Sequence, residues 1–512
     1  MRRSKIKKGK LLLWLGGVGL YVLALFLLTW AERTDPNASI QSLADAFWYS
    51  IVTMSTVGYG DLYPVTAAGR VLGVVFVLLS VGMLTFVIGL MIRLVMGKML
   101  PALKLRRLRS REWFLFSGSG PATAALQADL QKQYPDGVFL YPEGEEIPED
   151  GMLCPGSMET VAAQKKDRCS LFYVRGEYAR AVDALELGHP VYCLTECAPD
   201  AVPQGLTLVD PCECCAGAYW QDRGLEEGEK NIVLIGDGRH AQALLVKGLL
   251  LNVFSPWQRI RYYVSGDWED FQREHYRLQN VIAVNGKESG RDSLYFGRSW
   301  NEDPLLLQKA DRIILCHEDA EQNLRLLGQL RKYFPTKAKL HLRYPTELPG
   351  ETVFGTCETI FTARIVIRQQ QTKAARAMHE IYRRSTGGSA PAWEELSEFL
   401  RQSNIAAADH LITKLRLLLE EPDLAEVTGD ACARAFARYE QTPEKKETYR
   451  WIEHERWMRF HCLYNWEYDA VRNNAARRHP MILPYEDLSE AEQAKDDYAW
   501  LLLAELAEEL KA

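Results

Sequence analysis

The sequence predicts an α-helical membrane domain, then two α/β lobes, then an all-α C-terminal region. Three observations support this order. An uncharged apolar run of spanning length covers residues 11–30, and a second lies in a span predicted at residues 71–96. From residue 112, short apolar strands alternate with glycine turns and helices, which is typical of a doubly wound α/β fold. After residue 372, only helical spacing of apolar positions remains.

The segment between the two spans carries the most specific signal. Residues 42–55 predict a short amphipathic helix that ends at the hexapeptide Thr-Val-Gly-Tyr-Gly-Asp, residues 56–61. Carbonyl oxygens replace the hydration shell of K⁺ only if every carbonyl points inward, which requires backbone conformations that L-residues avoid. Gly58 and Gly60 permit a positive φ at two of these positions. Such irregular backbone is tolerated at membrane depth only where protein surrounds it or it lines a water cavity.

This order of span, helix, glycine-rich loop and span resembles the two-helix pore of potassium channels, over roughly residues 11–96. The resemblance implies that K⁺ binds at the first four filter positions and that a carboxylate marks the outer mouth. The implied filter is Thr56, Val57, Gly58, Tyr59, Gly60 and Asp61. Trp48 and Tyr49 are expected to pack around it as a cuff. Val52 stands where many bacterial channels have a glutamate, so a carboxyl–carboxyl contact to Asp61 is not available.

Basic residues flank both spans, before residue 11 and again at residues 98–111. The positive-inside rule then predicts that both termini are cytoplasmic and that the chain lies in the cell inner membrane. A signal peptide is the alternative for the first span, but its apolar run is too long and a second span follows. In the second span we expect Gly82 to be the gating hinge, although Gly89 and ordinary helix packing are alternatives.

Composition limits the function of the remainder. The 512 residues leave room for two or three soluble domains after the pore, and the net charge of −6 argues against a nucleic-acid binder. All 11 cysteines follow residue 150, on the side expected to be cytosolic, so they should be reduced. Five of them cluster between residues 193 and 215, where a zinc site and ordinary thiols both remain open.

The α/β part is predicted to contain two copies of a Rossmann-like lobe, residues 112–223 and 224–371. In the second copy, a strand at residues 232–235 runs into a glycine turn that opens a helix. Backbone N–H groups at such a helix start can hold a phosphate, which predicts a nucleotide-binding turn at Gly236, Gly238 and Ala241. The alternative is a glycine turn kept for helix–strand packing, since the acidic residue that should grip a ribose is not at its expected place.

A two-helix pore followed directly by Rossmann-like lobes resembles potassium channels with RCK domains, through arrangement more than motif. In that family eight lobes form a gating ring under a tetrameric pore. The resemblance implies a homotetramer with two lobes per chain, in which the residue 101–111 linker transmits the pull of the ring to the inner helices. Its basic residues would also be attracted to anionic lipid headgroups.

The rest of the chain is predicted to be helical. A helical region at residues 372–446 has helices expected at residues 373–384, 392–402 and 405–419. Residues 447–512 resemble the repeat domain of ryanodine receptors (RyR), through the helix that carries Glu453 and Trp457, the Trp466–Tyr468 turn and the His479-Pro480 run. Asn465 departs from the glycine usual in those repeats.

This RyR-type domain implies a compact helical sensor of a nucleotide-derived ligand. One loop joins aromatic rings, which can stack on a base, to arginine and histidine side chains, which can grip phosphate. The expected ligand-binding residues are Trp466, Tyr468, Arg472, Arg477, Arg478 and His479. The alternative is that these aromatic residues form the core of a small module.

Two classes of function were weighed. The first is a ligand-gated, K⁺-selective tetrameric channel that responds to a cytosolic nucleotide. The second is a membrane-tethered NAD-binding protein or redox enzyme that uses the Rossmann-like lobes. An enzyme needs a positioned general acid or base, and neither His240 nor His317 has a readable partner in sequence. No kinase, hydrolase or metalloprotease motif is present either, so the sequence favours the channel and predicts no catalytic residue.

Overall fold

The structure is a computed structural model that describes residues 18–55, 57–165, 167, 169–195, 202–286, 292–297, 299–367 and 370–510. The chain divides into two compact units. The first, the pore unit, comprises Met1–Arg109 with the short piece Leu153–Gly156. The second, the α/β–helical unit, comprises Ser110–Met152 and Ser157–Ala512. Each unit is described by itself below.

The pore unit has a helix at Val18–Glu32, then α2 (Leu43–Met54) and α3 (Ala67–Leu94). Ser42 and Asp45 form a capping box at the start of α2, with Ser42 Oγ accepting from Asp45 N at 3.1 Å. The predicted start of the first span, residues 11–17, lies outside the described residues. Among the residues described, Leu84–Arg107 is one stretch long and apolar enough to cross a membrane by length and composition.

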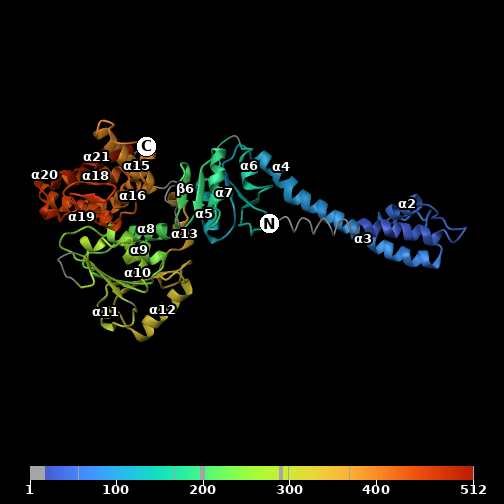
Figure 1. Cartoon of the computed structure of the whole chain (residues 1–512), viewed down its shortest axis with the longest axis horizontal. Coiled ribbons are helices and arrows are strands. Elements are labelled where there is room, and N and C mark those ends of the chain that lie inside the picture. The colour runs from blue at the N-terminus through green and yellow to red at the C-terminus, as the bar shows by residue number, and fades with distance from the viewer. Residues whose placement is uncertain are drawn as a thin grey trace. The chain divides into compact units, whose positions relative to one another are not determined.

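The second span continues further than predicted. After α3 comes a π-helical turn, η1 (Val95–Met99), and then α4 (Leu100–Arg107), so that one helical run extends from Ala67 to Arg107 (Figure 1). Most of the stretch predicted as a linker, residues 101–111, is therefore helical. Pro101 does not break the run because it lies in the first turn of α4, where its missing N–H costs little.

The first lobe is a six-stranded sheet in the order β3-β2-β1-β4-β5-β6, in which the strands from β2 to β6 run parallel. Its elements are β1 (Trp113–Phe116), α5 (Pro121–Gln133), β2 (Val138–Tyr141), β3 (Met152–Leu153), α6 (Met158–Ala162), β4 (Ser170–Tyr173), α7 (Tyr178–Asp183), η2 (Ala184–Leu187), β5 (Val191–Leu194), β6 (Leu206–Val209) and α8 (Pro211–Asp222). Stacked rings cross four strands on one face, from Tyr141 through Phe116 and Phe172 to Tyr192, with centroids 4.8–4.9 Å apart. This apolar face explains why strands form at these short aromatic runs.

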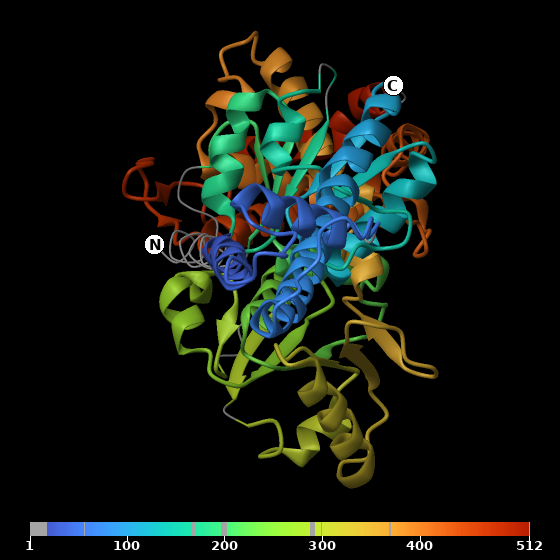
Figure 2. The same cartoon turned by 90° about the vertical axis from the view of Figure 1, so that its right-hand side faces the viewer.

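The second lobe is a seven-stranded sheet in the order β13-β12-β11-β7-β8-β10-β9. Its elements are β7 (Asn231–Ile235), α9 (Arg239–Leu251), β8 (Arg261–Ser265), α10 (Glu269–Glu274), η3 (Leu278–Asn280), β9 (Ala283–Val284), β10 (Ser293–Gly297), α11 (Pro304–Lys309), β11 (Arg312–Leu315), α12 (Ala320–Tyr333), β12 (Lys339–Arg343), β13 (Thr352–Phe354), α13 (Cys357–Ile360) and α14 (Ala363–Val366). Ile232 and Leu234 of β7 face one hydrophobic cluster, and Val233 and Ile235 face another. Helices therefore cover both faces of this sheet (Figures 1 and 2), as the doubly wound prediction requires.

The C-terminal part is helical, with one small sheet. Its elements are α15 (Gln370–Ser385), η4 (Trp393–Glu395), α16 (Glu398–Asp409), α17 (Leu411–Leu419), α18 (Gly429–Gln441), η5 (Pro443–Lys445), α19 (Lys446–Leu463), β14 (Glu467–Tyr468), β15 (Arg478–His479), η6 (Tyr485–Asp487), α20 (Glu490–Gln493), η7 (Ala494–Asp497) and α21 (Tyr498–Glu509). The parallel pair β14–β15 corrects the all-α expectation. The helix expected from residue 392 begins at Glu398 because Ser397 caps it, and the one expected at residues 405–419 is divided at His410.

The segments expected as a helical region and a separate C-terminal domain share one hydrophobic core. Met378 of α15, Leu415 of α17, Tyr439 of α18 and Trp500 of α21 all belong to it. Trp500 is fully buried, and its Nε1 donates to Tyr449 O at 3.0 Å. Cutting the chain near residue 446 would therefore open this core, and experiments on this part of the protein need the whole chain.

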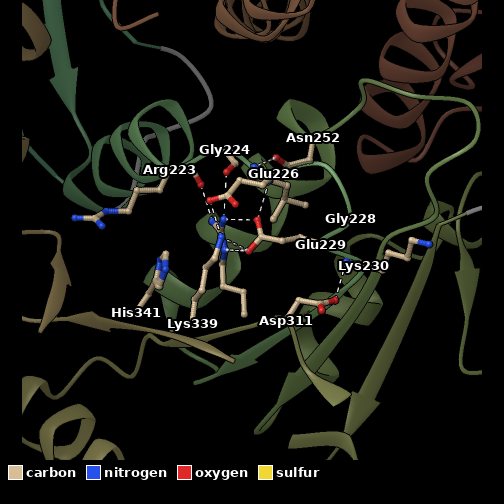
Figure 3. A network of polar contacts seen from close by, with 12 residues as sticks. Arg223, Gly224, Glu226, Gly228, Glu229, Lys230, Asn252, Asp311, Lys339 and His341 are labelled. Atoms are coloured by element: carbon tan, nitrogen blue, oxygen red, sulfur yellow. Dashed lines mark hydrogen bonds and ion pairs between the residues drawn. The ribbon is translucent and has the colours of Figure 1, made fainter. Parts of the chain in front are cut away.

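A buried ion pair fixes the connection between the two lobes, near the boundary predicted at residues 224–230 (Figure 3). Arg312 lies at the start of β11 with 2% of its surface exposed. Its Nη2 donates to Glu229 Oε2 at 2.6 Å and to Gly224 O at 3.1 Å, and its Nη1 donates to Arg223 O at 2.6 Å. Because one guanidinium holds both the carboxylate and the carbonyls of the connection, the path of the chain there is tightly specified.

Candidate functional site

The loop after α2 has the backbone that the filter prediction requires. Gly58 has φ +56° and Gly60 has φ +74°, both in the left-handed region where glycine is favoured. Gly58 N donates to Val52 O at 3.3 Å, which ties the loop to the end of α2. Thr56 lies outside the described residues. In the single chain, Val57 and Tyr59 are 54% and 68% exposed, so this loop has little protein around it.

Trp48 supports the outer end of the loop, as the expected cuff would. Its Nε1 donates to Asp61 Oδ2 at 2.9 Å, and its ring lies parallel to that of Tyr59 with centroids 6.4 Å apart. The indole therefore connects α2 to both sides of Gly60. Tyr49 faces elsewhere, lining a pocket with Pro64.

Glu32 is a supporting residue that the sequence analysis missed. It ends the first helix with 0% of its surface exposed. Its carboxylate accepts from Val65 N at 2.9 Å, from Thr66 N at 3.1 Å and from Thr66 Oγ1 at 2.7 Å. A buried carboxylate with three donors is well satisfied, and here it ties the irregular segment before α3 to the first helix. The available signal was an acidic residue directly after an apolar span.

Gly82 and Gly89 both lie inside α3, and a Cβ built on either meets nothing within 4 Å in the single chain. The helical pattern does not change at Gly82. It changes at the π-helical turn Val95–Met99, which contains Gly97. Such turns are common at functional sites in helices.

At the glycine turn of the second lobe, the glycines allow close backbone packing, and a carboxylate of the chain lies at the helix start where a phosphate could bind. A Cβ at Gly236, which has φ +145°, would lie 2.7 Å from Cys316 C, so this glycine is required for the close approach of two backbones. A Cβ at Gly238 would instead meet the Glu318 carboxylate. Ala241 is fully buried in α9. Of the three residues predicted to bind a nucleotide, Gly236 and Ala241 are thus accounted for by packing.

Glu318 lies where a phosphate at the start of α9 would lie. Its Oε1 accepts from His240 N at 2.9 Å, and its Oε2 accepts from His240 Nδ1 at 2.7 Å. Partial burial raises the pKa of Glu318, but the hydrogen bonds from His240 outweigh it and lower that pKa to about 2. The first lobe has a weaker equivalent, since Glu145 Oε2 lies 3.4 Å from Ser119 N at its own glycine turn. A carboxylate of the chain itself therefore occupies the anion position of the second lobe.

The C-terminal loop differs from the predicted ligand site. Trp466 is 5% exposed and packs against Phe399, with ring centroids 5.2 Å apart. His479 is 8% exposed, and burial, followed by the charges of Arg472 and Lys495, lowers its pKa to about 4. Both side chains are thus buried beneath the loop, so in this structure Trp466 does not present a free stacking face and His479 does not present a charge to a ligand.

The remaining loop residues are exposed, and three have partners. Arg478 pairs with Asp469 at 3.0 Å, and Arg477 Nη1 donates to Tyr464 O at 2.7 Å. Arg472 Nε donates to Asn474 Oδ1 at 2.9 Å. Tyr468 is 50% exposed. The loop thus retains one accessible ring and one arginine that has only an amide partner among the contacts described.

Asn465 shows why this position tolerates a residue other than glycine. It has φ +60°, a conformation that asparagine adopts more readily than most residues. Its Nδ2 donates to Glu274 O at 2.6 Å, and nearby Arg277 pairs with Glu467 at 2.6 Å. The loop is therefore docked on the end of α10 in the second lobe.

The cysteine cluster does not form a recognisable metal site in the described part of the chain. No group of three or more His, Cys, Asp or Glu side chains that could hold a metal ion is found there. Cys197 lies outside the described residues. Burial raises the pKa of Cys214 and Cys215 to about 12, so both thiols are protonated at neutral pH.

Comparison with known proteins agrees with the geometry of the pore unit. A family model described as Ion channel matches residues 11–97. A voltage-gated potassium channel of Aeropyrum pernix is 45% identical over 75 residues, which are 14% of this chain and 25% of that protein. Human potassium voltage-gated channel subfamily A member 4 is 42% identical over 74 residues, which are 14% of this chain and 11% of that protein. The chain thus spans a quarter or less of the length of these relatives.

Solved structures of a channel called GsuK are similar to a larger part of the chain. The structure described as the GsuK channel bound to NAD covers 70% of this chain and 82% of its own, with 13% identity and a TM-score of 0.31. The structure of GsuK bound to ADP covers 66% and 90%, with 16% identity and a TM-score of 0.29.

The N-terminal unit is thus an ion-channel pore region with potassium-channel relatives, and a pore of this class lies in a membrane. Two parallel α/β sheets and a helical C-terminal region follow it. The family model that matches this unit describes ion channels, and the relatives that match it are potassium channels.

Proposed function

We propose that this protein is a K⁺-selective channel of four identical chains. The observation that carries the proposal is the loop at residues 57–61, in which Gly58 and Gly60 have positive φ and Trp48 holds Asp61. A single loop cannot replace the hydration shell of K⁺, but four loops arranged around an axis supply stacked rings of carbonyls. The exposure of Val57 and Tyr59 in the single chain is what a filter shared among four chains requires.

The proposed orientation has both termini in the cytoplasm of a cell whose inner membrane holds the pore. The basic residues before the first helix and along α4 support it, because positive charge remains on the cytoplasmic side. In this arrangement the two α/β lobes are RCK-like and cytosolic. Two lobes in each of four chains would supply the eight lobes of a gating ring.

The proposal for the pore is tested by flux from vesicles that contain the purified full-length protein. Gly58→Ala should abolish K⁺ selectivity or conduction while tetramers still assemble, because alanine at φ +56° is strained. Gly19→Ala is the matched control, since Gly19 lies in the first helix without a positive φ and its built Cβ meets nothing within 4 Å. Normal selectivity for K⁺ over Na⁺ in Gly58→Ala channels would contradict the filter assignment.

We further propose that a cytosolic nucleotide-type ligand regulates the channel. One candidate position is the turn at Gly238, where a phosphate must displace Glu318. The GsuK structures bound to NAD and ADP suggest which nucleotides to try first. Gly238→Asp should remove binding by crowding and repulsion, with ADP and NAD titrated calorimetrically. An unchanged affinity in this variant would exclude the turn.

The other candidate position is the RyR-type loop of the C-terminal region. Trp466→Ala is unsuitable as a test, since removing a buried ring would destabilise the core. Tyr468→Ala and Arg472→Ala change exposed side chains and should shift the dose–response of the full-length channel without altering K⁺ selectivity. If neither variant shifts it, the loop is structural.

A further inference from the structure

A cavity of about 250 Å³ lies in the α/β–helical unit, away from both glycine turns. Its walls come from parts of the chain that are far apart in sequence. Gln221 comes from α8 of the first lobe, Arg364 from α14, Lys373 from α15 and Ile412 from α17. The segment just before α18 closes another side.

Asp409, at the end of α16, gives this cavity an unsatisfied acceptor. The residue lines the cavity and is 4% exposed. Its Oδ2 accepts from Lys247 Nζ at 2.6 Å, whereas its Oδ1 is buried and has no hydrogen-bond partner among the described residues. Lys247 Nζ also lies 3.5 Å from Glu213 Oε2. One ammonium therefore serves two carboxylates, and Asp409 retains capacity for another donor.

Two cationic side chains stand on the other walls. Arg364 pairs with Glu426 at 3.2 Å and stays partly exposed. Lys373 is exposed and has no ion pair in the part of the chain that the structure describes. Glu426 also lines the cavity, and apolar side chains complete the lining, with Ala374 and Ile412 both buried. Because Glu426 balances the charge of Arg364, the cavity offers an acceptor on Asp409, the positive charge of Lys373 and an apolar surface.

We propose that this cavity binds a small phosphorylated metabolite of mononucleotide size or less, with its phosphate at Lys373 and a hydroxyl donating to Asp409. A carboxylate that receives a sugar hydroxyl is a usual mode of ribose recognition. Ligand pockets generally measure about 300–1,000 Å³, so a cavity of about 250 Å³ favours a ligand at the small end of that range over a dinucleotide such as NAD. The site is separate from the pore, from the turn at Gly238 and from the RyR-type loop.

The test is calorimetric titration of the full-length protein in detergent, with ribose 5-phosphate, AMP and NAD as probes. Ribose 5-phosphate or AMP should bind, and NAD should not bind in a way that depends on this cavity. Lys373→Gln should weaken that binding about tenfold or more, because it removes the charge-assisted contact to phosphate. Ala425→Trp places a large ring at an exposed position on the wall, so the protein should fold and the cavity should be filled.

Two controls make the outcome specific. Lys337→Gln makes the same charge change at another exposed lysine and should leave the affinity unchanged. Gly238→Asp blocks the glycine turn and should also leave the affinity of the cavity unchanged. Binding at the cavity can therefore be confirmed or excluded whether or not the glycine turn binds a nucleotide. The proposal is overturned if neither ribose 5-phosphate nor AMP binds, or if Gly238→Asp abolishes the binding while Ala425→Trp does not.

Discussion

Removing the Glu318 carboxylate should increase the affinity of the second lobe for a nucleotide. Glu318 now accepts two hydrogen bonds from His240, at the position that a phosphate would take. Hydrogen bonds to a charged group contribute about 1.5–3 kcal/mol each. The Glu318 side chain is 51% exposed, so we take about 1.5–3 kcal/mol for the pair together. A ligand that no longer competes with this carboxylate should bind roughly 10 to 100 times more tightly.

The assay is calorimetric titration of ADP into full-length protein that carries Glu318→Ala or Glu318→Gln. Alanine removes both hydrogen bonds and the charge, whereas glutamine removes only the charge and can still accept from His240 N. The affinity should therefore increase from the unmodified protein to the glutamine variant and again to the alanine variant. Glu321→Gln is the matched control, because Glu321 lies three residues further on, in the first turn of α12, but accepts from Tyr344.

The reasoning is refuted if both Glu318 variants bind ADP no better than the unmodified protein.

The competition between Glu318 and ADP for this position should also be insensitive to pH near neutrality. The folded-state pKa of Glu318 is about 2 and its ordinary value is 4.5, so the stability that this carboxylate contributes is fully present above pH 4.5. That stability is lost as the pH falls toward 2. ADP affinity that changed steeply between pH 6 and 8 would point to another group.

Three further predictions concern the pore and the lobe connection. Trp48→Phe keeps the ring stack but loses the hydrogen bond to the filter mouth, about 1 kcal/mol, so single-channel recordings should show less stable openings with K⁺ selectivity retained. Glu229→Gln leaves a buried guanidinium without its carboxylate and should cost about 3–5 kcal/mol, which thermal unfolding would reveal, whereas Glu226→Gln at an exposed position should have little effect. Gly97→Ala should alter the open probability more than Gly82→Ala, because the helix changes its hydrogen-bond pattern at Gly97; the reverse order would restore Gly82 as the hinge.

The parts of the fold that the sequence predicted are those with a local pattern. The first strand of each lobe, at Trp113–Phe116 and Asn231–Ile235, is a short buried run before a glycine turn, and both strands form. Two strands of the second lobe, β10 (Ser293–Gly297) and β13 (Thr352–Phe354), were not predicted. β13 has only three residues, and β10 ends in Gly297, a residue type that is depleted in strands.

The candidate sites depend more on contacts between distant residues. The Glu318 carboxylate lies at a turn 78 positions earlier in the chain, and no local pattern indicates that it occupies the anion position. Trp466 was interpreted as an exposed ring because it lies in a loop, but Phe399 from α16 covers it. Glycine positions were more predictable, since the left-handed backbone at Gly58 and Gly60 follows from the filter motif itself. A site that depends on a local motif can therefore be predicted from the sequence. Whether a distant side chain of the same chain fills that site cannot.

These contacts constrain how any ligand can act on the pore. A ligand changes gating only through different affinities for the closed and open states, so it must bind where the two states differ. The helices of the C-terminal part share one core, and Asn465 docks their loop on the second lobe. Arg312 holds the connection between the lobes through Glu229. A local rearrangement inside any one of these contacts would leave buried charges or ring faces unsatisfied, which is costly. The cavity at Asp409 is different, since segments from the first lobe, α14, α15 and α17 meet around it without filling it. A ligand bound there can stabilise one arrangement of these segments over another without replacing the buried contacts at Arg312 or Asn465.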